Sequence, residues 1–106
     1  TSIEYGVKAS NIYLKIGALN EYADSQFLLA SYHTEVKAPK RSLKLLAKLE
    51  QFAINNGSRY YEARALLEQS FVYKMSGDKR NADIKKRKGI AIANEIGAKD
   101  LLKLAL

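Results

Sequence analysis

The sequence lacks cysteine and tryptophan, and its 106 residues include one histidine, one methionine and one proline. Without cysteine the chain can form no disulfide framework and no thiolate metal site. The single histidine, His33, leaves no set of imidazoles for a metal ion, and no serine, cysteine and carboxylate set completes a nucleophilic triad. Glycine loops that bind phosphate are missing as well. We therefore expect a protein that is not an enzyme and that has no catalytic residues, cofactor or metal.

Long apolar runs are also missing. The longest stretch without a charged residue runs from Ser25 to Thr34, which is too short to span a bilayer. No basic-then-apolar leader opens the chain, and the absence of cysteine suits a reducing compartment. We expect a cytoplasmic protein with no membrane partner. Because the chain starts at Thr1, inside what the pattern predicts to be a repeat, we expect residues 1–106 to be one domain of a longer protein.

The glycines that are present have a regular spacing. Gly17, Gly57 and Gly97 recur at a constant 40-residue interval, and each closes a stretch with helical apolar spacing. Glycine just past a helix end adopts the left-handed conformation without cost, and three at one interval indicate a repeat of paired helices. Between the glycines a 39-residue offset aligns similar residues better, for example Tyr32 with Phe71.

The spacing of apolar residues predicts helices throughout, and no segment alternates as a strand does. Capping residues, the proline and the glycines mark the boundaries. The predicted helices cover residues 1–16, 19–36, 39–56, 58–76 and 78–96, and a sixth, truncated helix covers residues 98–106.

Small and aromatic residues between Tyr61 and Gly97 follow a recognisable spacing: Leu66, Ser70, Tyr73, Gly77, Ala82 and Gly89. This stretch resembles a tetratricopeptide repeat (TPR). Its long period and its Ile92–Gly97 ending look like the 40-residue variant of maltose-activator-type regulators and signalling ATPases. The resemblance implies an all-α fold, a right-handed α-solenoid of antiparallel helix pairs with about five helices plus a truncated sixth. It also implies a protein-binding scaffold in transcription regulation or signalling, with no chemistry of its own.

The resemblance further implies a binding groove lined by the first helix of each pair. Carried onto this sequence, the lining positions are Arg64, Leu67, Phe71, Lys74 and Met75, and the 39-residue offset adds Ser25, Leu28, Tyr32 and Glu35. An apolar centre with a polar rim suits docking of a protein helix or a peptide. The alternative is that the aromatic residues among them belong to the core.

A basic run suggests a different partner. The formal net charge is +7, and six basic and two acidic residues lie between Asp78 and Lys88. The run Lys85, Lys86, Arg87 and Lys88 would bind nucleic acid through its phosphates, which is the alternative function. The simpler interpretation is a solvated helix face on which Asp83 pairs with Arg87.

Self-association is a third expectation. Incomplete repeats at the two ends of the chain would leave apolar helix faces uncovered. The residues concerned are Ile3, Val7, Leu101, Leu102, Leu104 and Leu106. We expect a terminal helix of one copy to pack against another copy.

Overall fold

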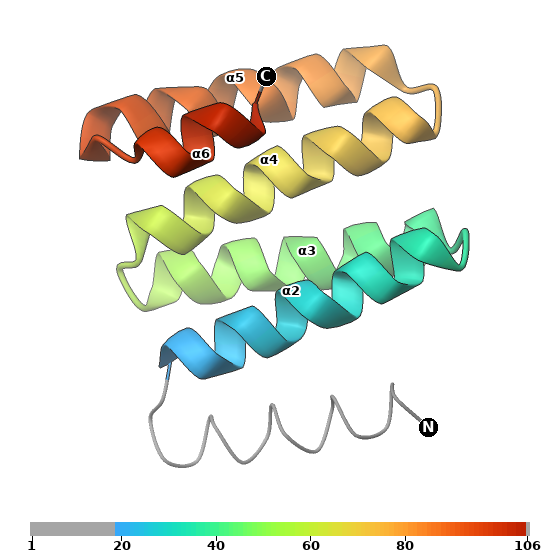
Figure 1. Cartoon of the computed structure of the whole chain (residues 1–106), viewed down its shortest axis with the longest axis horizontal. Coiled ribbons are helices and arrows are strands. Elements are labelled where there is room, and N and C mark those ends of the chain that lie inside the picture. The colour runs from blue at the N-terminus through green and yellow to red at the C-terminus, as the bar shows by residue number, and fades with distance from the viewer. Residues whose placement is uncertain (1–18, 106) are drawn as a thin grey trace.

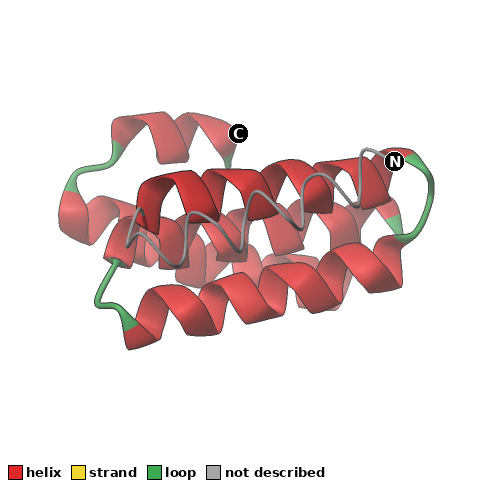
Figure 2. Cartoon of the chain, turned by 90° about the horizontal axis from the view of Figure 1, so that it is seen from below, coloured by secondary structure: helices red, strands yellow, loops and turns green. Residues whose placement is uncertain are grey.

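The computed structural model describes residues 19–105, which form five α-helices and no strand. The helices are α2 (Leu19–Glu35), α3 (Pro39–Asn55), α4 (Arg59–Met75), α5 (Lys79–Ile96) and α6 (Lys99–Leu104). Helices that follow one another in sequence pack against one another, and the turns alternate between the two ends of the molecule (Figures 1 and 2). The prediction of an all-α fold with antiparallel neighbours is therefore confirmed. The predicted helix over residues 1–16 and Gly17 lie outside the described residues.

The four turns are built alike. The helices begin at residues 19, 39, 59, 79 and 99, so helix and turn together repeat with a 20-residue period. Each turn has one residue with positive φ: 59° at Lys37, 69° at Gly57, 83° at Gly77 and 68° at Gly97. The N–H of the next residue donates to a carbonyl oxygen five positions earlier at 2.7, 2.8, 2.9 and 2.8 Å, respectively, as in the Schellman motif. The predicted helix ends at Gly57 and Gly97 are thus confirmed.

The helices form two layers. In Figure 1, α2, α4 and α6 lie towards the viewer and are called the front layer here, and α3 and α5 behind them are the back layer. The central helix α4 contacts all four of the others. Its Ala65 and Val72 join a core cluster with α2 and α3, and its Ala63, Leu66 and Leu67 join a second cluster with α5 and α6. Both cores are therefore organised around α4.

Two hydroxyl groups join neighbouring helices at close contacts. The Ser42 hydroxyl donates to the carbonyl oxygen of Ala30 at 3.0 Å, and the Ser70 hydroxyl donates to that of Ala82 at 2.7 Å. At the 40-residue offset between α2 and α4 and between α3 and α5, Ser70 corresponds to Ala30, and Ala82 corresponds to Ser42. The donor and the acceptor helix are therefore exchanged between the two contacts, and the same close approach is kept.

Gly89 of α5 marks another close approach. A Cβ atom added to Gly89 would lie only 2.7 Å from Leu67 Cγ of α4. A larger residue would therefore push the two helices apart. Ser70, Ala82 and Gly89 thus occupy close-contact positions, as predicted.

The molecule is a compact bundle. Its Cα radius of gyration is 13.4 Å, and its principal extents are 34 × 31 × 20 Å. These dimensions describe five sequentially packed helices in a globule and not an extended superhelix. No helix between residues 19 and 105 is long and apolar enough to cross a membrane.

Candidate functional site

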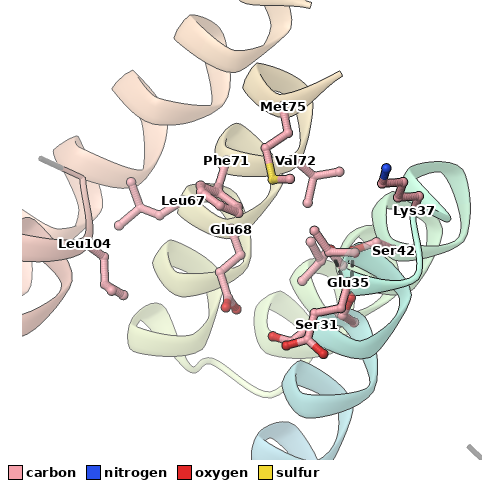
Figure 3. A pocket seen from close by; sticks show the side chains of 13 residues that line it. Ser31, Glu35, Lys37, Ser42, Leu67, Glu68, Phe71, Val72, Met75 and Leu104 are labelled. Atoms are coloured by element: carbon pink, nitrogen blue, oxygen red, sulfur yellow. Dashed lines mark hydrogen bonds between the residues drawn. The ribbon is translucent and has the colours of Figure 1, made fainter. Parts of the chain in front are cut away.

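A groove of about 630 Å³ opens between α2 and α4. Figure 3 shows Leu67, Phe71 and Met75 projecting from α4 towards it, with Ser31 and Glu35 of α2 on the other side. Two buried residues of α3, Ser42 and Leu46, also line the groove, and α6 contributes the exposed Leu104. Four of the five helices therefore contribute to one surface.

Several apolar side chains in the groove are exposed. Phe71 is 59% exposed, and Met75 and Leu104 are each 62% exposed. Leu67, Phe71 and Met75 recur at every fourth position, so they form one stripe along α4. Apolar patches of this kind on proteins in water mark contact sites. The groove thus has an apolar wall that a partner could cover.

The carboxyl group of Glu68 lies within this wall. Glu68 Oε2 is buried and has no hydrogen-bond partner among the described residues. The Nε atom of Arg64 lies 3.7 Å from Glu68 Oε2, which is close enough for charge attraction but too far for a hydrogen bond. Burial raises the pKa of Glu68 from 4.5 to about 7, although the Arg64 charge acts in the opposite direction. Glu68 is therefore only partly ionised at neutral pH.

Other contacts hold Arg64 in place. Its Cζ atom lies 4.2 Å from the centre of the Phe27 ring, and its Nη1 atom lies 3.2 Å from Asp24 Oδ1. Phe27 is buried and therefore provides a fixed platform for the guanidinium group. These contacts fix the position of the guanidinium group, in which Arg64 Nε stays 3.7 Å from Glu68 Oε2 and donates no hydrogen bond to it.

Four of the nine residues predicted to bind a partner line the groove: Glu35, Leu67, Phe71 and Met75. Phe71 is also well exposed, so the alternative that it belongs to the core does not apply to it. Phe27 of α2, which is not one of the nine, is 1% exposed and belongs to the core.

The other five predicted residues lie outside the lining. Leu28 and Arg64 lie three positions before Ser31 and Leu67, respectively, so each continues a lining face by one helical turn. Leu28 is 74% exposed and extends the apolar surface. Neither Ser25 nor Tyr32 nor Lys74 lines the groove, although Tyr32 and Lys74 are exposed.

The offset of the repeat explains why Tyr32 is outside. Helices α2 and α4 start at residues 19 and 59, and at this 40-residue offset Ser31 matches Phe71 and Glu35 matches Met75, all four in the lining. The 39-residue offset used in the prediction paired Phe71 with Tyr32 instead. One residue along a helix turns a side chain by about 100°. Tyr32 therefore lies on another face, where its ring meets the His33 ring edge-on at 6.0 Å.

The sequence prediction missed several groove residues, among them Ser31, Glu68 and Leu104. The 20-residue spacing of Gly57, Gly77 and Gly97 is a signal for Ser31, because it fixes the 40-residue offset between paired helices. No local pattern marks Glu68, since its burial depends on neighbouring helices.

The basic run lies on α5 in the back layer. Lys85 Nζ is 3.8 Å from Glu50 Oε1 of α3, and Arg87 Nε is 2.9 Å from Asp83 Oδ2. The predicted pairing of Asp83 with Arg87 is thus confirmed. Lys86 and Lys88 are exposed and take part in no ion pair within residues 19–105.

Charge differs between the two layers. α3 has four basic residues and one acidic residue, and α5 has six basic and two acidic residues. In contrast, α2 has three acidic residues and neither lysine nor arginine. The back layer therefore carries most of the positive charge of the described chain.

The expectation about apolar residues at the C-terminal end holds only in part. Leu104 is 62% exposed, but Leu101 is 1% exposed because α6 packs it into the cluster with α4 and α5. The expectation of an exposed Leu101 is therefore wrong, and Leu102 is partly buried against the same cluster. Ile3, Val7 and Leu106 lie outside the described residues.

Comparisons of the chain with protein-family models, curated protein sequences and solved structures found no match. The TPR resemblance therefore stays a prediction from the sequence. No group of three or more His, Cys, Asp or Glu residues that could hold a metal ion occurs in the described part of the chain.

Proposed function

We propose that this domain is a protein–protein interaction module, which binds a helix or peptide of a partner in the groove between α2 and α4. The observation that carries the proposal is the exposure of Phe71, Met75 and Leu104 within one groove. Covering side chains that are more than half exposed contributes roughly 1–2 kcal/mol for each of them. Three such residues can supply the apolar centre of a small interface.

The proposal extends to the architecture. We take the described helices to be pairs of a TPR-like solenoid that belongs to a larger regulator or assembly. The 20-residue period, the four matching turns and the close contacts of Gly89 and of Ser70 with Ala82 support this view.

Nucleic-acid binding by the back layer is the second candidate function. The positive charge of α3 and α5 favours this candidate. The two helices lie side by side in the back layer, where Lys85 of α5 pairs with Glu50 of α3. Clustered Lys and Arg side chains attract a phosphate backbone by releasing its counterions. The ion pairs of Lys85 and Arg87 weaken this candidate, because they offset part of the charge.

One set of variants separates the two functions. Helical peptides are first selected from a displayed library against the wild-type domain. Their affinity for Phe71→Ala should be at least tenfold lower, which corresponds to a loss of roughly 1.4 kcal/mol or more in binding free energy. The same peptides should bind a Lys86→Glu, Lys88→Glu double variant nearly as well as wild type. Ile54→Ala is the matched control, because Ile54 is 46% exposed but lies outside the groove. Fluorescence anisotropy measures all four affinities.

A labelled oligonucleotide tests the second candidate in the same assay. If nucleic acid is the partner, the double charge reversal should abolish its binding, and the affinity should fall steeply as salt increases. The groove proposal fails if no peptide is enriched, or if Phe71→Ala binds the selected peptides as tightly as Ile54→Ala does.

A further inference from the structure

The groove also specifies the charge of its occupant, an inference that rests on the proposed docking function. We propose that the occupant is an amphipathic helix of another protein that places one arginine or lysine side chain against Glu68, beside its apolar face. Three features support this: the shape of the apolar wall, the missing donor at Glu68, and the charges around it.

The apolar wall fits a helix. Leu67, Phe71 and Met75 extend along α4 for a length of about 12 Å, which is roughly two helical turns. A partner helix with apolar residues at positions i, i+4 and i+7 presents a stripe of similar length, about 10 Å. The alternative mode, addition of a strand to a sheet edge, needs a strand, and none is present among residues 19–105.

The carboxyl group of Glu68 needs a donor. Oε2 of Glu68 has no hydrogen-bond partner among the described residues, and Arg64 is held by Phe27 and Asp24. Oε2 itself is buried, but the Glu68 side chain as a whole is 29% exposed, so a group entering the groove can meet the carboxyl group from its exposed side. An ammonium or guanidinium group brings several N–H donors and one positive charge. Placed at the exposed side of the carboxyl group, it would therefore stabilise the ionised carboxylate.

The surrounding charges favour a cation. Three charged residues line the groove: Glu35 of α2, Lys37 of the turn after α2, and Glu68 of α4. Arg64 faces Glu68 from one helical turn earlier in α4. The lining residues of α3 and α6 carry no charge. Two carboxyl groups thus lie in the groove, and the one positive charge of the described lining lies in the turn.

A second copy of this chain is a poor occupant. Its most basic helix, α5, has its apolar face buried against α4: Ala82, Gly89, Ile92 and Ala93 are buried. Docking α5 in the groove of another molecule would require that contact to break. Docking of α5 from a second copy is therefore disfavoured, and we take the occupant to be a helix of another protein.

Selection followed by an isosteric exchange tests the inference. A displayed library of helical peptides is selected separately against wild type and against Glu68→Gln. Peptides selected against wild type should be enriched in basic residues at one position, and peptides selected against Glu68→Gln should not. The best wild-type binder is then made with arginine or with citrulline, which has the same shape without the charge. Citrulline should weaken binding to wild type about tenfold or more, because a hydrogen bond to a charged group is lost. It should leave binding to Glu68→Gln unchanged.

The controls separate this inference from the docking proposal. Glu62→Gln changes a carboxyl group of α4 outside the groove and should keep the preference for arginine. Phe71→Ala should weaken the arginine and citrulline peptides equally. If both peptides bind wild type equally and Phe71→Ala still abolishes binding, the charge inference is overturned and the docking proposal stands. If no library peptide is enriched by either protein, the docking proposal itself fails, and the inference falls with it.

Discussion

The change Gly89→Ala sets two opposing effects against each other within α5. Glycine inside a helix costs about 1 kcal/mol relative to alanine, so helix propensity alone predicts a more stable protein. The packing predicts the reverse. A Cβ atom at this position would lie 2.7 Å from Leu67 Cγ, 2.8 Å from Leu67 Cδ2 and 3.3 Å from the Ala63 carbonyl oxygen.

The packing effect should prevail. Carbon atoms pack best at about 3.5–4.0 Å, so the new methyl group overlaps Leu67 by about 1 Å. Leu67 is 6% exposed and packs in the core cluster with α5 and α6, so its side chain can yield only towards the groove that it lines. Overpacking of this kind costs about 1–3 kcal/mol, which exceeds the gain in helix propensity. We expect the free energy of unfolding to fall by about 1 kcal/mol.

Urea unfolding followed by circular dichroism measures this change, and a background mutation identifies its cause. In a Leu67→Ala background the clash with Leu67 is absent and only the 3.3 Å contact with the Ala63 carbonyl oxygen remains, so Gly89→Ala should raise the free energy of unfolding by up to about 1 kcal/mol. Ala91→Gly, at an exposed position of α5, serves as the control for propensity and should lower it by a similar amount. A rise on Gly89→Ala in the wild-type background would refute the close contact between α4 and α5.

Two further changes test the turns and the groove. Lys37→Gly should raise the free energy of unfolding by about 1 kcal/mol, because Lys37 has a φ of 59°, which glycine adopts without strain; an unchanged urea midpoint would contradict this. Glu68→Gln should alter the pH profile, since burial raises the pKa of Glu68 from 4.5 to about 7. The folded state then holds this proton more tightly than the unfolded chain, so the stabilisation is complete below about pH 4.5 and is lost as the pH rises through 7. Wild type should lose roughly 1–3 kcal/mol relative to Glu68→Gln across this window, and parallel profiles would disprove it.

The helix boundaries could be predicted because local chemistry sets them. Pro39 begins α3, Ser58 caps α4 by accepting from the Tyr61 N–H, and the Asp78 carboxylate caps α5 by accepting from the Asn81 N–H. These signals depend on a few neighbouring residues, so the sequence alone contains them. The turn at Lys37 is an exception to the glycine pattern, yet its backbone adopts the same conformation as the other three turns.

The groove could be predicted only in part because it depends on helix register. The stripe of Leu67, Phe71 and Met75 on α4 was predicted from the lining positions that the TPR resemblance implies. The facing wall required the correct offset, and a shift of one residue exchanged Ser31 for Tyr32. The state of Glu68 depends on how neighbouring helices exclude water from it, which no pattern within α4 reveals.

The sequential packing of the helices has a consequence for synthesis in the cell. Each described helix after α2 packs against the helix that precedes it in the chain. A helix that leaves the ribosome therefore finds one packing partner already made and does not wait for distant segments to begin packing. Contacts between chain neighbours also close short loops, which favours rapid folding. The central helix α4 can complete the first core cluster with α2 and α3 while α5 is still being synthesised.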